Sequence, residues 1–474
     1  MVMTAGFAVG CGGGSQPPST GPGSGATSSV TVTLSSTAND QVSGFNLTLD
    51  SVTLTNQSGK IVTLLSKPVS AEFIHLNGTV EPLVTASIPQ DTYTSATVTV
   101  GESRFFCVTL DPATGNGIDV SNFAYGQTPS SQVSTTLPAP ITVAGNAMEL
   151  MLNMQVSPSA TYNTCIQNSI EPYSINPTFS LASFDFPAQP TNSSNGEAIA
   201  LEGFISSVDT ASNAFTVAAA DGPSWTVKTS ATTLFQGVAG FHALAAGVPV
   251  DMDGAIQTDG SLLASRIAVY DKNTTALSIV TGPLLFVDTL VPELLTFGRE
   301  QQGALYAASK FISPPSYNFG NATFPTSGQL ANLRGLPFAP SFTAANMVAG
   351  QNVSITSHAA ALLNSPNRIA AATVTLMPQT INGTIAAVST SGGFDTYTVL
   401  LAPYDLIPAL AVQPGQTTLL ANPGTVVVYV DSNTQMLNST VLQPGTVMRF
   451  YGLLFNDQGT LRMDCTQVND GVAE

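Results

Sequence analysis

Apolar and polar positions alternate repeatedly through the first third of the chain. Four stretches show this period of two, and clusters of Gly, Asn, Asp or Ser bound them: residues 30–34, 45–49, 52–54 and 96–100. Such alternation places successive side chains on opposite faces of a β-sheet. The pattern predicts an antiparallel β-sandwich over residues 29–187, with one face of each sheet buried and a Thr-rich face in water.

A second pattern follows a linker of Pro, Asn, Ser and Gly, and it recurs. Its first and last copies share a Leu-x-x-Gly turn that leads into an alternating strand, and the interval from Gly247 to Gly254 equals that from Gly445 to Gly452. Glycines at strand starts permit the bends that close a small barrel. The chain is therefore predicted to be all-β, with three small OB-like barrels after the sandwich. Their ranges are 197–272, 277–378 for a degenerate middle copy with a long insertion, and 380–470.

Both regions resemble known families. Residues 72–78, 83–93 and 96–100 resemble the bacterial family called domain of unknown function 4382, although Gln90 and Asp91 stand where its members have a small residue and Gly. That resemblance implies a lipoprotein-associated β-sandwich and brings no known activity. The repeated unit resembles the family called domain of unknown function 5666, which the first copy matches best. This second resemblance implies a small antiparallel barrel similar to an OB-fold.

The N-terminus predicts export. A short apolar run ends in small residues before Cys11, and residues 8–11 resemble the lipobox of bacterial lipoproteins, in which the cysteine is lipidated. Ala8 replaces the usual Leu, and no Lys or Arg precedes the run. The next residues form an uncharged Gly, Ser and Pro tether. We expect residues 1–28 to be a lipoprotein signal and flexible tether, with an ordinary secretory signal or a buried strand as the alternative.

The composition of the chain limits the classes of molecule that we expect it to bind. Charged residues make up only 9% of the chain, and 12 Lys and Arg against 29 Asp and Glu give a net charge of −17. A field of that sign repels polyanions, so nucleic acid is not an expected partner. The expected partners are the membrane, through the lipid anchor, and a glycan or another envelope protein. The predicted location is the outer membrane, with the body in the periplasm or on the cell surface.

The remaining cysteines fit an oxidising compartment. Cys107 and Cys165 both fall in the predicted sandwich, and we expect them to form a disulfide. The alternative is two separate buried thiols. Cys465 is left over, either as a buried thiol or as a reactive one.

No catalytic or metal-binding pattern stands out. His75, His242 and His358 each stand apart from Cys, Asp or Glu at ligand spacing, so we expect no catalytic site, no metal and no cofactor. Residues 251–254 with Asp259 are the best calcium candidate, but the remaining ligands of a calcium loop are missing, and solvated turn aspartates are the expectation. Glu149 and Glu202 are expected to be exposed strand positions.

Aromatic residues are the remaining candidate ligand contacts. Trp225 lies in a predicted strand of the first barrel, and Tyr317 and Phe319 lie in the insertion of the middle copy. Aromatic rings on a long loop can stack on sugars or anchor a partner, and the alternative is that they pack on one another.

Three functions are compatible with these features. The first is a non-enzymatic, lipid-anchored cell-envelope protein with a binding or structural role. The second is a carbohydrate-binding or adhesive surface protein, which requires an exposed aromatic platform. The third is a hydrolase whose paired carboxylates leave no trace in sequence spacing.

Overall fold

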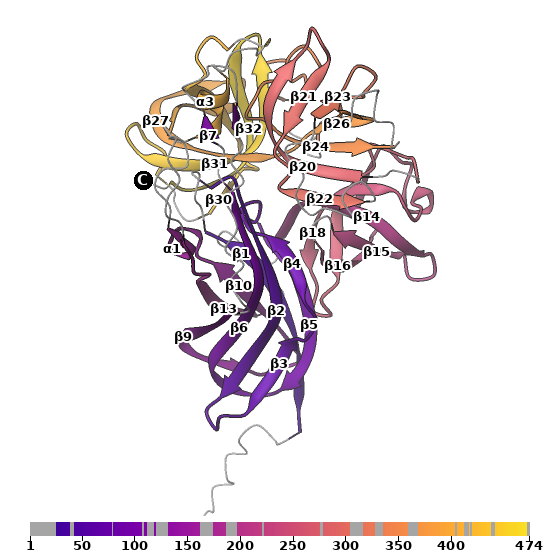
Figure 1. The fold of residues 1–474 in the computed structure, drawn as a ribbon, viewed down its shortest axis with the longest axis vertical. Helices are drawn as coiled ribbons and strands as arrows, with labels where there is room; N and C mark the ends of the chain where they lie inside the picture. Colours follow the sequence, from indigo (N-terminus) through magenta and orange to yellow (C-terminus); the bar gives the residue numbers. More distant parts are fainter. Residues whose placement is uncertain are drawn as a thin grey trace, which may run out of the picture.

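The chain folds into four β-rich bodies; in Figure 1 the N-terminal sandwich extends to the bottom, and the first repeat body lies beside its upper part. The structure is a computed structural model, and it describes residues 25–37, 42–77, 79–106, 109–110, 118–119, 131–161, 174–185, 197–219, 222–274, 278–303, 316–327, 335–358, 368–402, 405–411, 417, 420–437 and 441–471. Within these residues, strands dominate and helices are short, so the predicted all-β class is confirmed. None of the described helices is long and apolar enough to cross a membrane. The residue boundaries predicted for the domains stay a prediction.

The sandwich consists of two main sheets. One has the order β13-β10-β1-β5, and its strands are β1 (Thr27–Ser36), β5 (Glu81–Pro89), β10 (Ala147–Met154) and β13 (Phe179–Asp185). The other contains β2 (Gly44–Asn56), β3 (Ile61–Leu65), β4 (Val69–Glu72), β6 (Asp91–Phe106) and β9 (Ser131–Val143). Short elements also occur in this part of the sequence: β7 (Thr109–Leu110), β8 (Ile118–Asp119), α1 (Val156–Ser159), β11 (Ala160–Thr161) and β12 (Ser174–Ile175). β1 pairs with β10 in parallel, and the other pairings in these two main sheets are antiparallel.

The predicted wet face of the first sheet is buried. Val30, Val32 and Leu34 of β1 point into the sandwich core, as their alternation predicted. Thr31 and Thr33, on the opposite face, are also fully buried. The reason is tertiary, because the first barrel packs on this face. A polar strand face is exposed only where no other body covers it.

The first and last barrels share one topology. The first is built from β14 (Glu197–Asp209), β15 (Ala214–Ala219), β16 (Ser224–Lys228), β17 (Leu234–Gln236), the 3₁₀ turn η1 (Phe241–Ala243), β18 (Pro249–Ile256) and β19 (Leu262–Ala268). The last is built from β27 (Gln379–Ser391), β28 (Phe394–Leu401), α3 (Leu406–Leu410), β29 (Thr425–Val430), β30 (Gln435–Met436), β31 (Val447–Asp457) and β32 (Thr460–Asp470). A parallel pairing closes each ring, β16 with β19 and β29 with β32.

The middle repeat is a broken version of the same ring. Its strands are β20 (Ser278–Asp288), β21 (Glu293–Thr296), β22 (Glu300–Gly303), β23 (Ser316–Asn318), β24 (Asn352–Ser357), β25 (Arg368–Ala370) and β26 (Thr373–Leu376). The sheet ends at β25 on one side and at β26 on the other, although these two strands follow each other along the chain. The degenerate sequence of this copy thus corresponds to a sheet that stays open at one place.

One backbone contact recurs in all three repeats and explains the Leu-x-x-Gly pattern. Gly247, Gly350 and Gly445 have φ values of +87°, +94° and +90°, which side chains other than glycine rarely adopt. Each glycine N–H donates to the carbonyl of a residue in the first strand of its repeat, at 2.7–2.8 Å, and that residue's own N–H donates to the carbonyl that follows the glycine. The two residue types that accept these bonds are Ile, at 205 and 385, and Leu, at 284. The repeat therefore preserves a glycine turn that holds the bent first strand.

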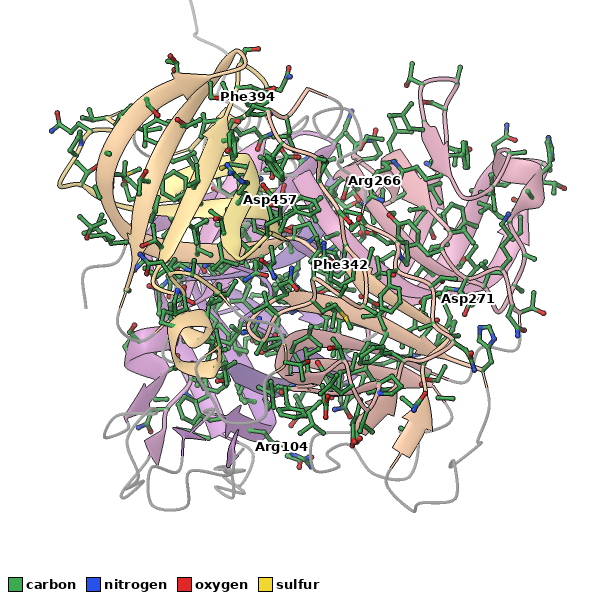
Figure 2. All side chains as sticks on the ribbon, turned by 90° about the horizontal axis from the view of Figure 1, so that it is seen from above. Arg104, Arg266, Asp271, Phe342, Phe394 and Asp457 are labelled. Carbon is green, nitrogen blue, oxygen red and sulfur yellow. The ribbon has the colours of Figure 1, made fainter. Side chains whose placement is uncertain are left out.

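Hydrogen bonds and apolar contacts join the four bodies. The indole N–H of Trp225 donates to the carbonyl of Pro82 in the sandwich at 2.9 Å. The middle repeat reaches the last barrel through Gln351, whose Nε2 donates to the carbonyl of Leu454 at 2.8 Å. Phe342, near the centre of Figure 2, belongs to an apolar cluster that also contains Phe455 of the last barrel.

Candidate functional site

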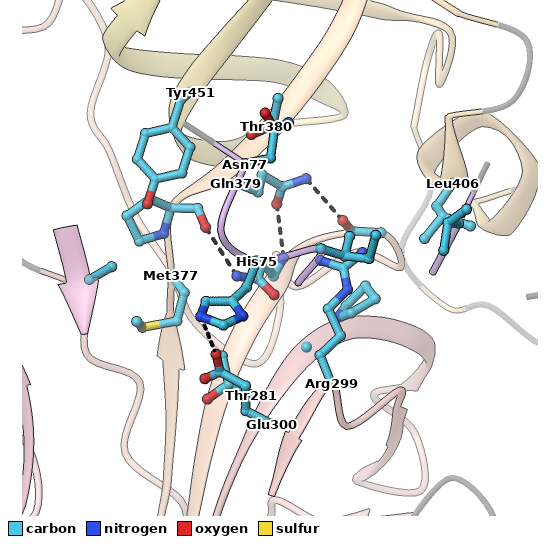
Figure 3. Close-up of a pocket in the computed structure, with 18 of the residues that line it drawn as sticks. His75, Asn77, Thr281, Arg299, Glu300, Met377, Gln379, Thr380, Leu406 and Tyr451 are labelled. Atoms are coloured by element: carbon cyan, nitrogen blue, oxygen red, sulfur yellow. Dashed lines mark hydrogen bonds and ion pairs between the residues drawn. The ribbon is translucent and has the colours of Figure 1, made fainter. Parts of the chain in front are cut away.

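A cavity of about 130 Å³ lies where the four bodies meet. Figure 3 shows side chains from separate parts of the chain converging on it. The sandwich contributes His75 and Asn77, the first barrel contributes Ala200, the middle repeat contributes Thr281, Asn352, Arg299 and Glu300, and the last barrel contributes Gln379, Thr380, Asp405, Arg449 and Tyr451. Long-range folding alone creates this site, because its lining residues come from segments that lie far apart in the sequence.

A tight turn after β4 positions His75. The buried carboxylate of Glu72, at the end of β4, accepts hydrogen bonds from the backbone N–H groups of Phe45 at 2.8 Å and His75 at 2.9 Å. The same carboxylate lies 3.1 Å from Nδ1 of His75. One side chain therefore fixes both the turn and the orientation of the imidazole ring.

The other ring nitrogen joins the sandwich to the middle repeat. Nε2 of His75 lies 2.9 Å from Oε1 of Glu300 and 3.6 Å from Oε2 of Glu81. Burial by itself lowers the pKa of His75, but the ion pair with Glu300 and the hydrogen bonds to Glu300, Glu72 and Glu81 raise that pKa well above its ordinary value. The imidazole is thus held protonated between carboxylates. The expectation that His75 stands apart from acidic groups was wrong, because these groups come from three different strands or turns.

The same contacts determine the pKa of Glu72. Burial raises its pKa, but the hydrogen bond and charge of His75, the charge of Arg299 and the bond from Phe45 together lower it below the ordinary value. Arg299 is itself anchored, since its Nε donates to the carbonyl of Ser43 at 2.6 Å. Opposite charges therefore alternate across the junction between the sandwich and the middle repeat.

Amide groups form another part of the wall. Oε1 of Gln379 accepts from the backbone N–H of Asn352 at 2.8 Å, and its Nε2 donates to the carbonyl of Gly350 at 3.0 Å. Nδ2 of Asn352 donates to the carbonyl of Pro378 at 3.0 Å. These bonds, dashed in Figure 3, fix this wall before any ligand is present. A preformed polar wall of this kind suits the binding of a small polar molecule.

A second charged cluster lies between the first barrel and the middle repeat. Arg266 makes two hydrogen bonds to each of the carboxylates of Asp251 and Asp253, at 2.6–3.1 Å. Glu202 pairs with Asp251 across β14 and β18, and it is only 8% exposed. Burial, the charges of Asp251 and Glu300, and the opposing bonds from Thr281 and Ser354 together raise the pKa of Glu202 to about 8.

Three expectations about acidic residues are corrected by this geometry. Asp251 and Asp253 lie in a strand and bind an arginine, so they are not solvated turn aspartates. Glu202 is buried because the middle repeat covers it. Glu149 is fully buried on the sheet face that the first barrel covers, and burial, partly offset by a bond from Thr33, raises its pKa to about 7. Strand alternation identifies the face of a carboxylate, and it carries no information about what covers that face.

The aromatic candidates are also buried. Trp225, Tyr317 and Phe319 are 4%, 0% and 3% exposed. Phe319 packs edge-to-face on Phe324, which packs in the same way on Phe342. The alternative of packing within the insertion therefore describes Tyr317 and Phe319, because a Pro-rich loop has to cover its own apolar surface. Trp225 is buried for a different reason, since it belongs to the core of the first barrel and contacts the sandwich. The exposed aromatic platform that a sugar-binding role requires is absent at these three positions.

The cysteine and metal predictions have different outcomes. Cys11, Cys107 and Cys165 lie outside the described residues, so their predicted lipidation and disulfide stay predictions. Cys465 is a buried free thiol. Within the part of the chain that the structure describes, no group of three or more His, Cys, Asp or Glu side chains is placed to hold a metal ion.

Sequence reasoning did not identify Glu72, Glu81, Arg299 or Glu300 as junction residues. Two signals were available. Glu72 stands three positions before His75 in an apolar segment, and Arg299 and Glu300 are adjacent charges in a chain with few of them. Neither signal indicates that the two segments meet.

Comparisons with known proteins add one positive finding. No curated protein matches the chain. Two solved structures are similar to it at a level that carries no argument. A copper(II)-bound tryptophan-to-alanine variant of CusF from Escherichia coli has a TM-score of 0.14 and 17% identity over 18% of this chain and 100% of that one. A glycoside hydrolase of family 32 from Bifidobacterium adolescentis has a TM-score of 0.10 and 8% identity over 93% of this chain and 67% of that one. Residues 202–268, which span most of the first barrel, match the model of the family described as domain of unknown function (DUF5666), as the resemblance of the repeat predicted.

Proposed function

We propose that this protein is a non-enzymatic, lipid-anchored cell-envelope protein that binds a small polar ligand in the junction cavity. One observation carries the binding role: a cavity of about 130 Å³ is lined by charged, hydroxyl and amide side chains from separate bodies. This volume is well above the roughly 10–15 Å³ that a cavity needs to hold one water, so the cavity has room for several waters or for a small ligand. The lipobox-like residues before Cys11 and the tether after it support the anchor.

The chemistry of the cavity supports binding over catalysis. A general base has to release its proton near the working pH. His75 is instead held protonated by Glu300, Glu72 and Glu81, which raise its pKa. A second group of acidic residues, which includes Glu202 and Asp251, borders a space of only about 20 Å³. That space holds one or two waters and is too small for a sugar ring, which argues against the hydrolase alternative.

A ligand titration tests the binding role. Amide chemical shifts of the full chain would be followed with acetate, glycine, phosphate and glucose as separate probes, which distinguishes anionic, zwitterionic and neutral ligands. Thr380→Phe fills the cavity from β27 and is expected to abolish the shifts. Thr384→Phe, on the same strand outside the cavity lining, is the matched control. Shifts that are absent for all four probes, or that persist unchanged in Thr380→Phe, would contradict the binding role.

The anchor requires its own test. Cells expressing the parent or Cys11→Ser would be labelled with radioactive palmitate. The parent is expected to carry label and the variant to carry none. Equal labelling of both proteins would remove the anchor from the proposal and leave the cavity unaffected.

A sugar-binding role is the second candidate, and one groove favours it. The groove measures about 280 Å³ and runs between β5 and the first barrel, with Thr85, Ser224, Thr226, Ser261 and Asp259 along it. Hydroxyl and carboxylate groups are suitable partners for sugar hydroxyls. A glycan array with the parent and with Ser224→Trp, which obstructs the groove, tests it. Signals that are missing, or that are indifferent to the substitution, would eliminate this candidate.

A further inference from the structure

Glu202 lies at the contact between the first barrel and the middle repeat, within two facing rows of polar side chains. On the barrel side, Glu202 of β14 is directly opposite Asp251 of β18. On the other side, Thr281 of β20 is directly opposite both Ser354 of β24 and Glu300 of β22. The hydroxyl group of Thr281 donates a hydrogen bond to Oε2 of Glu202, and the side chain of Ser354 also forms a hydrogen bond with this carboxyl group.

The charges around Glu202 do not compensate a second negative charge. Asp251 is 2% exposed, and like charges directly opposite each other in a sheet are destabilising. Arg266 already makes two hydrogen bonds to Asp251 and two to Asp253. Ionised Glu202 would therefore add a buried negative charge between Asp251 and Glu300. Its described neighbours Asp251, Thr281, Ser354 and Glu300 include no cation to balance that charge.

The more distant titratable groups do not change this balance. Asp271 borders the same small space as Glu202 and Asp251, and its carboxylate is paired with His358. His75 contacts Glu300 and is bound to Glu72 and Glu81 as well. Tyr451 of β31 lies near the same groups, and its pKa is raised by burial first and then by Asp253 and Asp251, so it stays neutral. The neutral form of Glu202 is the form that this interface accommodates.

We propose that the contact between the first barrel and the middle repeat is a proton-dependent latch, closed while the Glu202 carboxyl is protonated and loosened when it ionises. Ionisation places three carboxylates, Glu202, Asp251 and Glu300, around one buried contact. The latch would respond on the alkaline side of neutrality, since the pKa of Glu202 is raised to about 8. The latch shares Thr281 and Glu300 with the lining of the junction cavity, but its test requires no ligand.

Small-angle scattering of the full chain between pH 6 and pH 9.5 tests the latch. The radius of gyration of the parent is expected to increase with a midpoint near pH 8. The radius of Glu202→Gln is expected to stay constant, because its side-chain amide remains neutral and can still form hydrogen bonds. Glu102→Gln, at a more exposed carboxylate paired with Arg104, is the control and should follow the parent. A parent that stays compact to pH 9.5, or a Glu202→Gln variant that expands with the parent's midpoint, would overturn the proposal.

A second measurement keeps the test decisive if Glu202→Gln does not fold. The side-chain carboxyl carbons of Glu would be labelled with ¹³C in the parent and titrated by NMR. One carboxyl with a midpoint near pH 8 is expected. Glu149 is expected to supply a separate signal near pH 7, which the Glu149→Gln variant identifies. The latch would be overturned if every other Glu carboxyl titrated below pH 6.

Discussion

Nε2 of His75 lies 2.9 Å from Oε1 of Glu300, and this contact joins the turn after β4 of the sandwich to β22 of the middle repeat. Glu72 holds the opposite ring nitrogen at 3.1 Å. The imidazolium therefore bridges two bodies that no local sequence pattern connects, and it balances carboxylates that burial would otherwise destabilise.

Removing this bridge should destabilise the junction. We expect His75→Ala to lower the free energy of unfolding by about 3 kcal/mol at pH 6, because it leaves buried carboxylates without their cation. The pKa of His75 is raised in the folded protein. The stabilisation is thus complete below the ordinary pKa of 6.5 and declines as the pH rises toward the folded pKa. The loss of unfolding free energy should therefore be smaller at pH 9.

Urea unfolding of His75→Ala and the parent, followed by the fluorescence of Trp225, measures the loss at both pH values. The control is His242→Ala, at an exposed histidine, where a change within about 0.5 kcal/mol is expected. A loss in His75→Ala no larger than in this control would contradict the bridge.

Glu149 should make stability fall with rising pH. Its Oε1 accepts from Thr33 at 2.7 Å, and its Oε2 has no hydrogen-bond partner among the described residues. The pKa is raised from 4.5 to about 7, so between these values the folded state keeps a proton that the unfolded state has lost. The stability that this group contributes is present at low pH, and about 3 kcal/mol of it is lost as the pH rises through this window.

Glu149→Gln removes the titrating group. The difference in unfolding free energy between variant and parent should shift in favour of the variant by that amount from pH 4.5 to pH 8. Urea unfolding at both pH values measures the shift. A difference that is the same at both values would show that Glu149 does not titrate in this way.

Alanine substitution at two glycines of the last barrel should lower the free energy of unfolding by different amounts. A Cβ at Gly383 would lie 2.2 Å from the carbonyl oxygen of Leu400, whereas a Cβ at Gly445 would meet nothing within 4 Å but requires φ near +90°. We expect Gly383→Ala to cost about 3 kcal/mol through steric overlap and Gly445→Ala to cost about 1–2 kcal/mol through backbone strain. Gly424→Ala has neither problem and should lie within about 0.5 kcal/mol of the parent. Thermal unfolding of the three variants ranks them, and an equal cost at Gly383 and Gly424 would contradict the close strand approach.

Thiol counting tests the predicted disulfide. The thiol of Cys465 is 1% exposed, its Sγ–H donates to the carbonyl of Gln467, and burial raises its pKa. Native protein should therefore leave Cys465 unlabelled. After unfolding without reductant, we expect Cys465 to be the only reactive thiol of the mature body, because a Cys107–Cys165 bridge consumes the other two. Closing so long a loop is worth about 4 kcal/mol in the loop-entropy model. Three reactive thiols would rule out the bridge.

The sequence by itself determined the strands, the repeats and the compartment hypothesis. Period-two alternation at positions such as Val30, Val32 and Leu34 identifies a core face, since side chains in a strand alternate between two sides. The glycine turns at Gly247 and Gly445 were readable for a related reason, because only glycine adopts their backbone conformation readily. These features depend on neighbours in the chain, and so the sequence displays them.

Only the tertiary structure decided what covers each sheet face and which charges meet. Thr31 and Glu149 have the pattern of exposed strand residues, yet the first barrel covers their face of the sheet. His75 and Glu300, like Glu202 and Thr281, come together because whole bodies dock on one another. The interaction between two such residues depends on their separation in space, and no local periodicity encodes the packing of one closed barrel against another. The junction cavity and the carboxylates with raised pKa values are products of that docking.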